Sequence, residues 1–439
     1  MTTRADRTDS RAGGLRAALR NLGWLLASRG MLAVLSLLYL GIATRTLGLA
    51  DFGRFALVTG AVQGLALLIS FQTWQVVVRY GVDHRARGDD RALARLFRAC
   101  LILDGAGALI GIAAGAAFLL WWGDALGIGA ALRRDAMILT VAQLGSVRSA
   151  AVGVLRLQDR FGQAAAADLV TPVVRLAGAI AAAAALPTLG AFLWSWAAAE
   201  VATAGAYWWA LARSGELGRV RRVRAERGTV ARENPGIGPF LVTSNLASTL
   251  VLGTKQVPLL LVGGFAGPAA AGAFRLALQL AQALGKLAQL ISRAAFPEVV
   301  RALRDASPEE LGVLSRRMLR AGGLAAIVIL CVVAAVGRPA LVLVGGDESY
   351  AAGFPLLLWL AAAGSIDLAV VGLEPVLLAA GRSGAALASR AAGVAVQVGV
   401  SLYLLPRIGA SGASVGVFAA SLLGALLMIR AVFRAPAQR

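Results

Sequence analysis

Long apolar segments follow one another along nearly the whole chain, and this succession limits the folds open to it. A helix must supply about 20 apolar residues to cross a membrane, because each residue advances about 1.5 Å through about 30 Å of hydrocarbon. About twelve segments meet this requirement, near 22–46, 54–78, 96–122, 135–157, 164–186, 189–212, 238–263, 268–293, 318–345, 353–380, 385–405 and 409–432. Hydrophobic residues make up 58% of the 439 residues and charged residues 15%. Because a soluble domain cannot bury so much apolar surface, the sequence predicts an all-α integral membrane protein.

The positive charges predict how the chain is oriented in the membrane. Lysine and arginine fall mostly on alternate loops and both terminal segments, which the positive-inside rule assigns to the cytoplasm. Those on the opposite loops are Arg45, Arg54, Arg133, Arg134, Arg338 and Arg407. We therefore expect a multi-pass protein of a bacterial cytoplasmic (inner) membrane with both termini cytoplasmic. The first apolar run is too long for a signal peptide, so we interpret it as a retained span. The net charge of +20 then reflects solvated loops near anionic lipid, and no nucleic acid is expected.

The two halves of the chain repeat one another. Leu186–Ala191 (LPTLGA) returns as Leu405–Ala410 (LPRIGA), about half the chain length later, and Phe52–Phe55 has a weaker counterpart near Phe274 at the same spacing. An even number of spans in each copy gives a parallel repeat, an arrangement used by transporters that move two bundles about a central site. The predicted division is a six-helix lobe at 1–212, a basic cytoplasmic linker at 213–237 and a second six-helix lobe at 238–439.

Charged residues inside the predicted spans are candidate functional residues, because each costs about 2.5–3.5 kcal/mol at mid-membrane. The cations are Arg29, Arg148, Arg175, Lys255, Arg275 and Lys286, and the acids are Asp104, Asp168, Glu200, Asp367 and Glu374. The first, seventh and eighth spans carry cations and no acid. This segregation of cations from acids is the most informative feature of the sequence.

The eighth span carries a polar face over most of its length. Arg275, Gln279, Gln282, Lys286, Gln289 and Arg293 are spaced alternately by four and three residues, which places them on one side of a helix. Glutamines that join neighbouring helices could explain one such position. Cations distributed through the membrane depth favour the wall of a water-filled pathway.

Other polar residues are open to two interpretations. Asp367 and Glu374 are either pairing partners or a site for a coupling cation. For Arg148, Arg175, Asp104, Asp168 and Glu200 we expect structural ion pairs within the first lobe. With one histidine, His84, and no Cys-x-x-Cys pattern, no metal or other cofactor is expected.

These features together resemble the polysaccharide flippase family, the Wzx-type branch of the multidrug/oligosaccharidyl-lipid/polysaccharide exporter superfamily. The resemblance extends over nearly the whole chain. It lies in the two groups of six spans and in four stretches: Arg45–Gly53, Leu155–Phe161, Ala294–Glu298 and Leu405–Ala413.

The resemblance implies a function and a site. In that family the first, second, seventh and eighth spans line the central cavity, so the implied cavity residues are Arg29, Arg79, Lys255, Arg275, Gln279, Gln282, Lys286 and Gln289. The implied substrate is a polyprenyl-pyrophosphate-linked oligosaccharide, moved across the membrane by alternating access for surface polysaccharide biosynthesis. The implied partners are this substrate, membrane lipids, and polysaccharide polymerase and export components.

Two alternatives belong to other classes of protein. An ion-coupled antiporter of drugs or organic cations, from the same superfamily, would need an acidic cavity. A polytopic polysaccharide polymerase would need a large external loop with catalytic groups, and the longest predicted external loop, near 123–134, has no histidine or paired carboxylates. We therefore expect a transporter and not an enzyme. The glycan, the coupling ion and the oligomeric state do not follow from the sequence.

Overall fold

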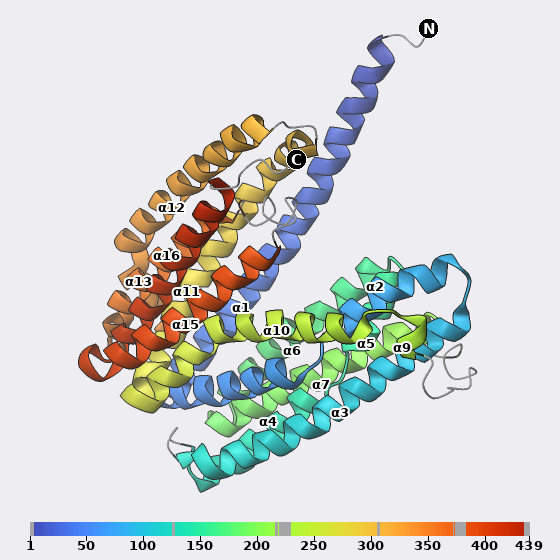
Figure 1. The fold of residues 1–439 in the computed structure, drawn as a ribbon. Coiled ribbons are helices and arrows are strands. Elements are labelled where there is room, and N and C mark those ends of the chain that lie inside the picture. The colour runs from blue at the N-terminus through green and yellow to red at the C-terminus, as the bar shows by residue number, and fades with distance from the viewer. Residues whose placement is uncertain are drawn as a thin grey trace.

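The computed structural model shows an all-α membrane protein (Figure 1). It describes residues 4–124, 128–215, 218, 230–304, 308–371, 373 and 383–433. For 4–33, 131, 247, 251–253, 284–304, 308–315, 317, 318, 383, 385, 386 and 433 it describes the backbone alone. Within these residues the elements are helices joined by short turns, with no strand. The predicted fold class is confirmed.

The first half of the chain forms one group of helices. The bounds are Arg4–Ile69 (α1), Thr73–Ala86 (α2), Asp90–Trp122 (α3), Ala130–Gly145 (α4), Ser149–Leu157 (α5), Phe161–Ala185 (α6) and Leu189–Arg213 (α7). Helices α2 to α7 pack mainly against one another, in blue through cyan to green in Figure 1. We call α2–α7 the N-terminal bundle.

The second half forms another group. The bounds are Val230–Glu233 (α9), Ile237–Lys255 (α10), Val257–Arg304 (α11), Pro308–Gly345 (α12), Glu348–Gly353 (the 3-10 helix η2), Phe354–Val370 (α13), Ser383–Ile408 (α15) and Ser411–Phe433 (α16). Helices α11, α12, α13, α15 and α16, in yellow to red in Figure 1, pack together as the C-terminal bundle. Helix α1 contacts both bundles and packs most extensively on α11.

Nine segments of the described chain are long and apolar enough to cross a membrane. One of them, Val34–Ala86, includes part of the first predicted span and all of the second. Helices α7 and α10 occupy the sixth and seventh predicted spans but are not among the nine. The count of about twelve spans and the boundaries of the two lobes stay predictions.

Three spans that we expected to be continuous are interrupted. The predicted helix 54–78 is broken at 70–72, 135–157 is broken at 146–148, and 238–263 is broken at Gln256. Backbone groups released by a break inside a membrane need other partners. Distant side chains supply them: Ser149 Oγ accepts from the Trp74 N–H (3.1 Å), and the Val147 carbonyl accepts from Trp208 Nε1 (2.7 Å).

The two long helices α1 and α11 are kinked at equivalent positions. Gly48 in α1 has φ 71° and ψ 175°, and Gly267 in α11 has φ 82° and ψ 176°. Glycine adopts positive φ without the steric penalty of other residues. Gly48 and Gly267 are separated by the same distance along the chain as Leu186 and Leu405, so the repeated sequence carries a repeated backbone conformation.

The link between the two halves is attached to the N-terminal bundle. In the segment between α9 and α10, Asn234 Oδ1 lies 2.9 Å from Nε2 of His84, and both residues are buried. Glu233 in α9 forms an ion pair with Arg95 of α3. Residues 230–234, expected to belong to a linker, are therefore held against the last turn of α2 and the first turns of α3.

Candidate functional site

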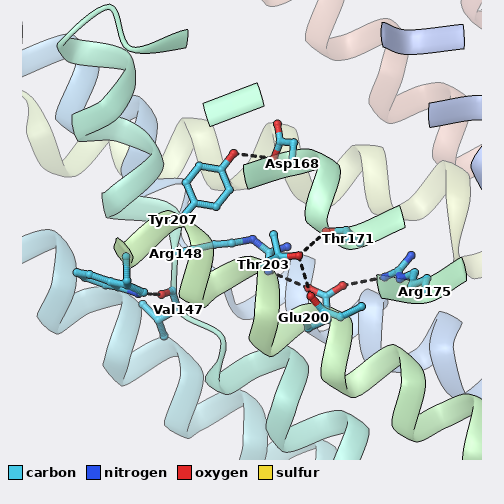
Figure 2. Close-up of polar contacts among 10 residues, drawn as sticks. Val147, Arg148, Asp168, Thr171, Arg175, Glu200, Thr203 and Tyr207 are labelled. Carbon is cyan, nitrogen blue, oxygen red and sulfur yellow. Dashed lines mark hydrogen bonds and ion pairs between the residues drawn. The ribbon is translucent and has the colours of Figure 1, made fainter. Parts of the chain in front are cut away.

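A buried carboxylate joins two arginines inside the N-terminal bundle (Figure 2). Glu200 of α7 is 2% exposed. Its Oε2 lies 2.9 Å from Nη1 of Arg148, and its Oε1 lies 2.7 Å from Nη2 of Arg175. Two cations on one carboxylate leave the cluster with one net positive charge. We call Arg148, Arg175 and Glu200 the Glu200 triad.

Neighbouring hydrogen bonds hold the helices of the triad in place. The hydroxyl groups of Thr171 in α6 and Thr203 in α7 are 2.7 Å apart, and the Tyr207 hydroxyl donates to Asp168 Oδ1 at 2.6 Å (Figure 2). Arg148 lies directly before α5, in the break at 146–148. The helix break thus brings this guanidinium to Glu200.

A third arginine approaches the triad from the other half of the chain. Arg275 of α11 is within electrostatic range of Arg175 and of Tyr39 in α1. Arg275, Gln279, Tyr39 and Trp196 line one small recess. The Arg175 guanidinium stacks 3.8 Å from the centre of the Trp196 ring, and its Nε has no hydrogen-bond partner within the described part of the chain.

Arg275 carries a charge that the described residues do not balance. Among the described side chains it forms no ion pair with an acid. With the surplus charge of the Glu200 triad beside it, the seam between α1, α6, α7 and α11 is cationic. Guanidinium groups bind phosphate oxygens through paired N–H donors, so the charge of this seam favours an anion, and its recess of about 10 Å³ would have to widen to admit one.

The other predicted cavity residues lie at several places. Gln282 is half-buried one turn beyond Gln279 on α11, and Lys255 is exposed at the end of α10. Arg79 is exposed on α2, and its guanidinium lies 4.5 Å from the ring centre of Phe240 in α10. The described side chains therefore bring Arg275 and Gln279 together, but not Arg79 or Lys255 with them.

Several predicted residues cannot be placed by their side chains. Arg29, Lys286 and Gln289 lie in α1 and α11 where only the backbone is described, and Glu374 lies outside the described residues. Asp367 of α13 is beside Ser421 of α16 and within electrostatic range of Arg390 of α15. The two interpretations of Asp367 and Glu374, as pairing partners or as a site for a coupling cation, both stay predictions.

The expected ion pairs of the first lobe formed only in part. Glu200 does pair with Arg148 and Arg175. Asp104 instead accepts from the Thr73 hydroxyl (2.8 Å) and the Ala150 N–H (3.1 Å), and Asp168 accepts from Tyr207. Hydroxyl and backbone donors satisfy these two carboxylates, so neither has a cation as its partner among the described residues.

The aromatic residues beside the triad were not predicted from the sequence. Trp196 stacks on Arg175, and Tyr39 packs edge-on against Trp196 with ring centres 5.0 Å apart. The separation of four residues between Trp196 and Glu200 was a signal, because it places both on one face of a helix.

Comparison with known proteins identifies the family. The family described as polysaccharide biosynthesis protein matches residues 18–302. The inner membrane protein YghQ of Escherichia coli (strain K12) is 31% identical over 348 residues, covering 76% of this chain and 94% of YghQ. The chain belongs to the polysaccharide biosynthesis protein family. The predicted family is confirmed, and the YghQ relationship supports an inner-membrane location.

Solved structures share the fold of this family member. A lipid II flippase, MurJ, in an inward closed conformation aligns with a TM-score of 0.68 and 8% identity, covering 93% of this chain and 87% of MurJ. An inward-facing multidrug resistance MATE family transporter of the MOP superfamily aligns with a TM-score of 0.62 and 15% identity, covering 92% of this chain and 98% of that chain. At these identities the likeness concerns the fold alone.

Proposed function

We propose that the protein is a flippase that moves a polyprenyl-pyrophosphate-linked oligosaccharide across the cytoplasmic membrane for surface polysaccharide biosynthesis. The observation that carries this proposal is Arg275, a cation with no acidic partner among the described residues, next to the surplus charge of the Glu200 triad. The family membership and the fold shared with MurJ support the same function.

The pyrophosphate would bind at the seam between α6 and α11. Arg275 and Arg175 supply N–H donors from the two halves of the chain, and Gln279 adds an amide on the face of α11 that carries Arg275. A phosphate bridging these helices would draw the halves together, whereas an empty seam brings like charges close. Substrate binding would therefore favour one relative position of the halves, as alternating access requires.

The orientation of the protein in the membrane would set the direction of transport. Both termini would be cytoplasmic, so transport runs from the inner to the outer leaflet. The polar face of α11 would continue the pathway through Gln282, Lys286 and Gln289, and Arg29, Arg79 and Lys255 would line its other parts. Polysaccharide polymerase and export components would receive the product, and the protein itself would perform no covalent chemistry.

The test compares two arginines in a strain that lacks the protein. Complementation with Arg275→Gln should give normal membrane yield and a roughly ten- to a hundredfold loss of surface polysaccharide, because one charge-assisted contact to phosphate contributes about 1.5–3 kcal/mol. Arg275→Lys should retain part of the activity. Arg407→Gln is the matched control, since Arg407 is exposed at the end of α15 and donates to its own helix.

Two results would contradict the proposal. One is surface polysaccharide at the wild-type level in the strain without the protein, when no second flippase is encoded. The other is resistance to cationic drugs that depends on the protein, with surface polysaccharide unaffected. The second result would favour the antiporter alternative.

A further inference from the structure

A polar cavity lies inside the N-terminal bundle, beside the Glu200 triad. Its volume is about 460 Å³, within the range of about 300–1,000 Å³ that is usual for small-ligand sites. The breaks at 70–72 and 146–148 both open onto it, and Ser70, Phe71, Gln72, Ser146, Val147 and Arg148 line it. Transporters commonly form their substrate sites where membrane helices are interrupted.

The charges around the cavity are nearly balanced. Asp104 and Glu200 line it together with Arg148, and Glu200 also binds Arg175. These lining groups carry charges of both signs, in contrast to the cationic seam at Arg275. The cavity therefore favours a ligand that is polar but uncharged.

The lining retains many free hydrogen-bonding groups of both kinds. A guanidinium has five N–H donors, and Arg148 uses one of them on Glu200. Gln63 accepts from Gln256 (3.1 Å) and Gln72 accepts from Trp74 Nε1 (2.9 Å), which leaves both amide nitrogens as donors. Gln143 has no partner among the described residues. Mixed donors and acceptors at short range match the hydroxyl groups of a sugar.

Asp104 and Trp74 are held in fixed positions in the cavity wall. Asp104 is bound at both helix breaks, through Thr73 at the start of α2 and Ala150 at the start of α5. The Trp74 ring is held by Gln72 and by the Arg156 guanidinium, 4.2 Å from the ring centre. A rigid aromatic ring beside a carboxylate offers an apolar surface for sugar C–H groups and an acceptor for sugar hydroxyls.

We propose that this cavity binds a sugar ring of the transported head group, while the seam at Arg275 and Arg175 binds its pyrophosphate. This inference rests on the proposed flippase function and deepens it. Glu200 is common to both regions, since it lines the cavity and pairs with Arg175. The N-terminal bundle thus selects the glycan, and the seam recognises the pyrophosphate that carries it.

The experiment fills the cavity without changing its charge. Ala108 of α3 lines the cavity, whereas Ala106 of the same helix is exposed. Purified Ala108→Phe and Ala106→Phe proteins are compared for binding of two probes, by native mass spectrometry with competition. One probe is undecaprenyl pyrophosphate, and the other is the sugar-bearing lipid extracted from cells that lack the protein.

We expect Ala108→Phe to bind undecaprenyl pyrophosphate as the wild type does and the sugar-bearing lipid at least about tenfold more weakly, because the sugar loses its hydrogen bonds. Ala106→Phe should bind both probes normally. Gln143→Leu keeps the side-chain volume and removes the amide, and it should show the same selective loss. It provides the test if Ala108→Phe does not fold.

The outcomes separate the two proposals. If both Gln143→Leu and a folded Ala108→Phe retain wild-type affinity for the sugar-bearing lipid, the sugar site is wrong and the flippase function stands. If the wild-type protein binds neither lipid, the function itself is wrong. Saturable binding of the cation tetraphenylphosphonium that Ala108→Phe abolishes would also overturn the sugar assignment.

Discussion

Gly53 of α1 and Gly272 of α11 lie directly against one another, backbone to backbone. A Cβ atom at Gly53 would be 1.7 Å from the Pro268 carbonyl oxygen, and one at Gly272 would be 2.5 Å from the Leu49 carbonyl oxygen. Each glycine follows the kink of its own helix by five residues, Gly48 or Gly267. The equivalent helices of the two halves therefore meet at equivalent residues.

Substitution at this crossing should destabilise the protein. Gly53→Ala and Gly272→Ala force the two backbones apart, and we expect each to cost about 1–3 kcal/mol and to lower the melting temperature in detergent. Gly264→Ala is the control, because it lies in α11 with no atom within 4 Å of the added Cβ. It should be neutral or slightly stabilising. Equal melting temperatures for Gly53→Ala and Gly264→Ala would show that the crossing can relax.

Neutralising Glu200 should destabilise the folded protein. Glu200→Gln leaves Arg148 and Arg175 without their shared anion, which should cost about 3–5 kcal/mol and reduce membrane yield. Adding Arg148→Gln should restore part of the yield, since the two changes are coupled. Asp168→Asn is the control, as its amide oxygen can still accept from Tyr207. A normal yield of Glu200→Gln would exclude a structural role for the triad.

Labelling of introduced cysteines tests the orientation. Ser349 lies in η2 and is exposed, and Ser214 directly follows α7. In a background with Cys331, the exposed native cysteine, replaced by serine, a membrane-impermeant maleimide should label Ser349→Cys in intact cells. Ser214→Cys should react only after the cells are opened. Labelling of Ser214→Cys in intact cells would reverse the predicted topology and the proposed direction of transport.

The N-cap of α3 should make stability depend on pH in acid. Asp89 accepts from the Ala92 N–H at 2.9 Å, and this hydrogen bond, with the nearby charges of Arg95 and His84, lowers the pKa of Asp89. A lowered folded-state pKa stabilises the protein above the unfolded pKa of about 3.9, and the contribution disappears as pH falls through the folded value.

Asp89→Ala should therefore cost about 0.5–2 kcal/mol at pH 7, and its difference from the wild type should shrink below about pH 4. Asp90→Ala, one residue later in the exposed first turn of α3, is the control for a lost negative charge. The check is the melting temperature of the three proteins between pH 3 and pH 7. A difference that stays constant over this range would contradict the capping role.

Sequence patterns predicted the helical architecture and the family. Of the charged residues described at the site, they indicated Arg275 as a cavity residue, and Arg148, Arg175 and Glu200 only as structural ion pairs. They did not predict the partners of Asp104, because its carboxylate is satisfied by Thr73 and Ala150, which lie far from it in the chain. The break at 70–72 was missed for the same reason. Ser70, Phe71 and Gln72 include neither glycine nor proline, and the contacts that stabilise the break come from other helices.

The spacing of the repeat was visible in the sequence, but its structural meaning was not. Phe52–Phe55 and Phe274 already indicated an equivalence between the start of the second span and the start of the eighth. That Gly53 and Gly272 touch required the three-dimensional arrangement, since periodicity describes one helix at a time. The proximity of Arg275 to Arg175 could not be predicted from the sequence either, because no local pattern relates α11 to α6.

The attachment of residues 230–234 to His84 and Arg95 bears on how such a protein could have arisen. The segment that precedes the second half carries its own docking contacts for the first half. A separately made second half that began at Val230 would thus already recognise its partner. Two ancestral half-sized proteins could have assembled through these contacts before their genes were joined, and the covalent link would then have fixed an association that already existed.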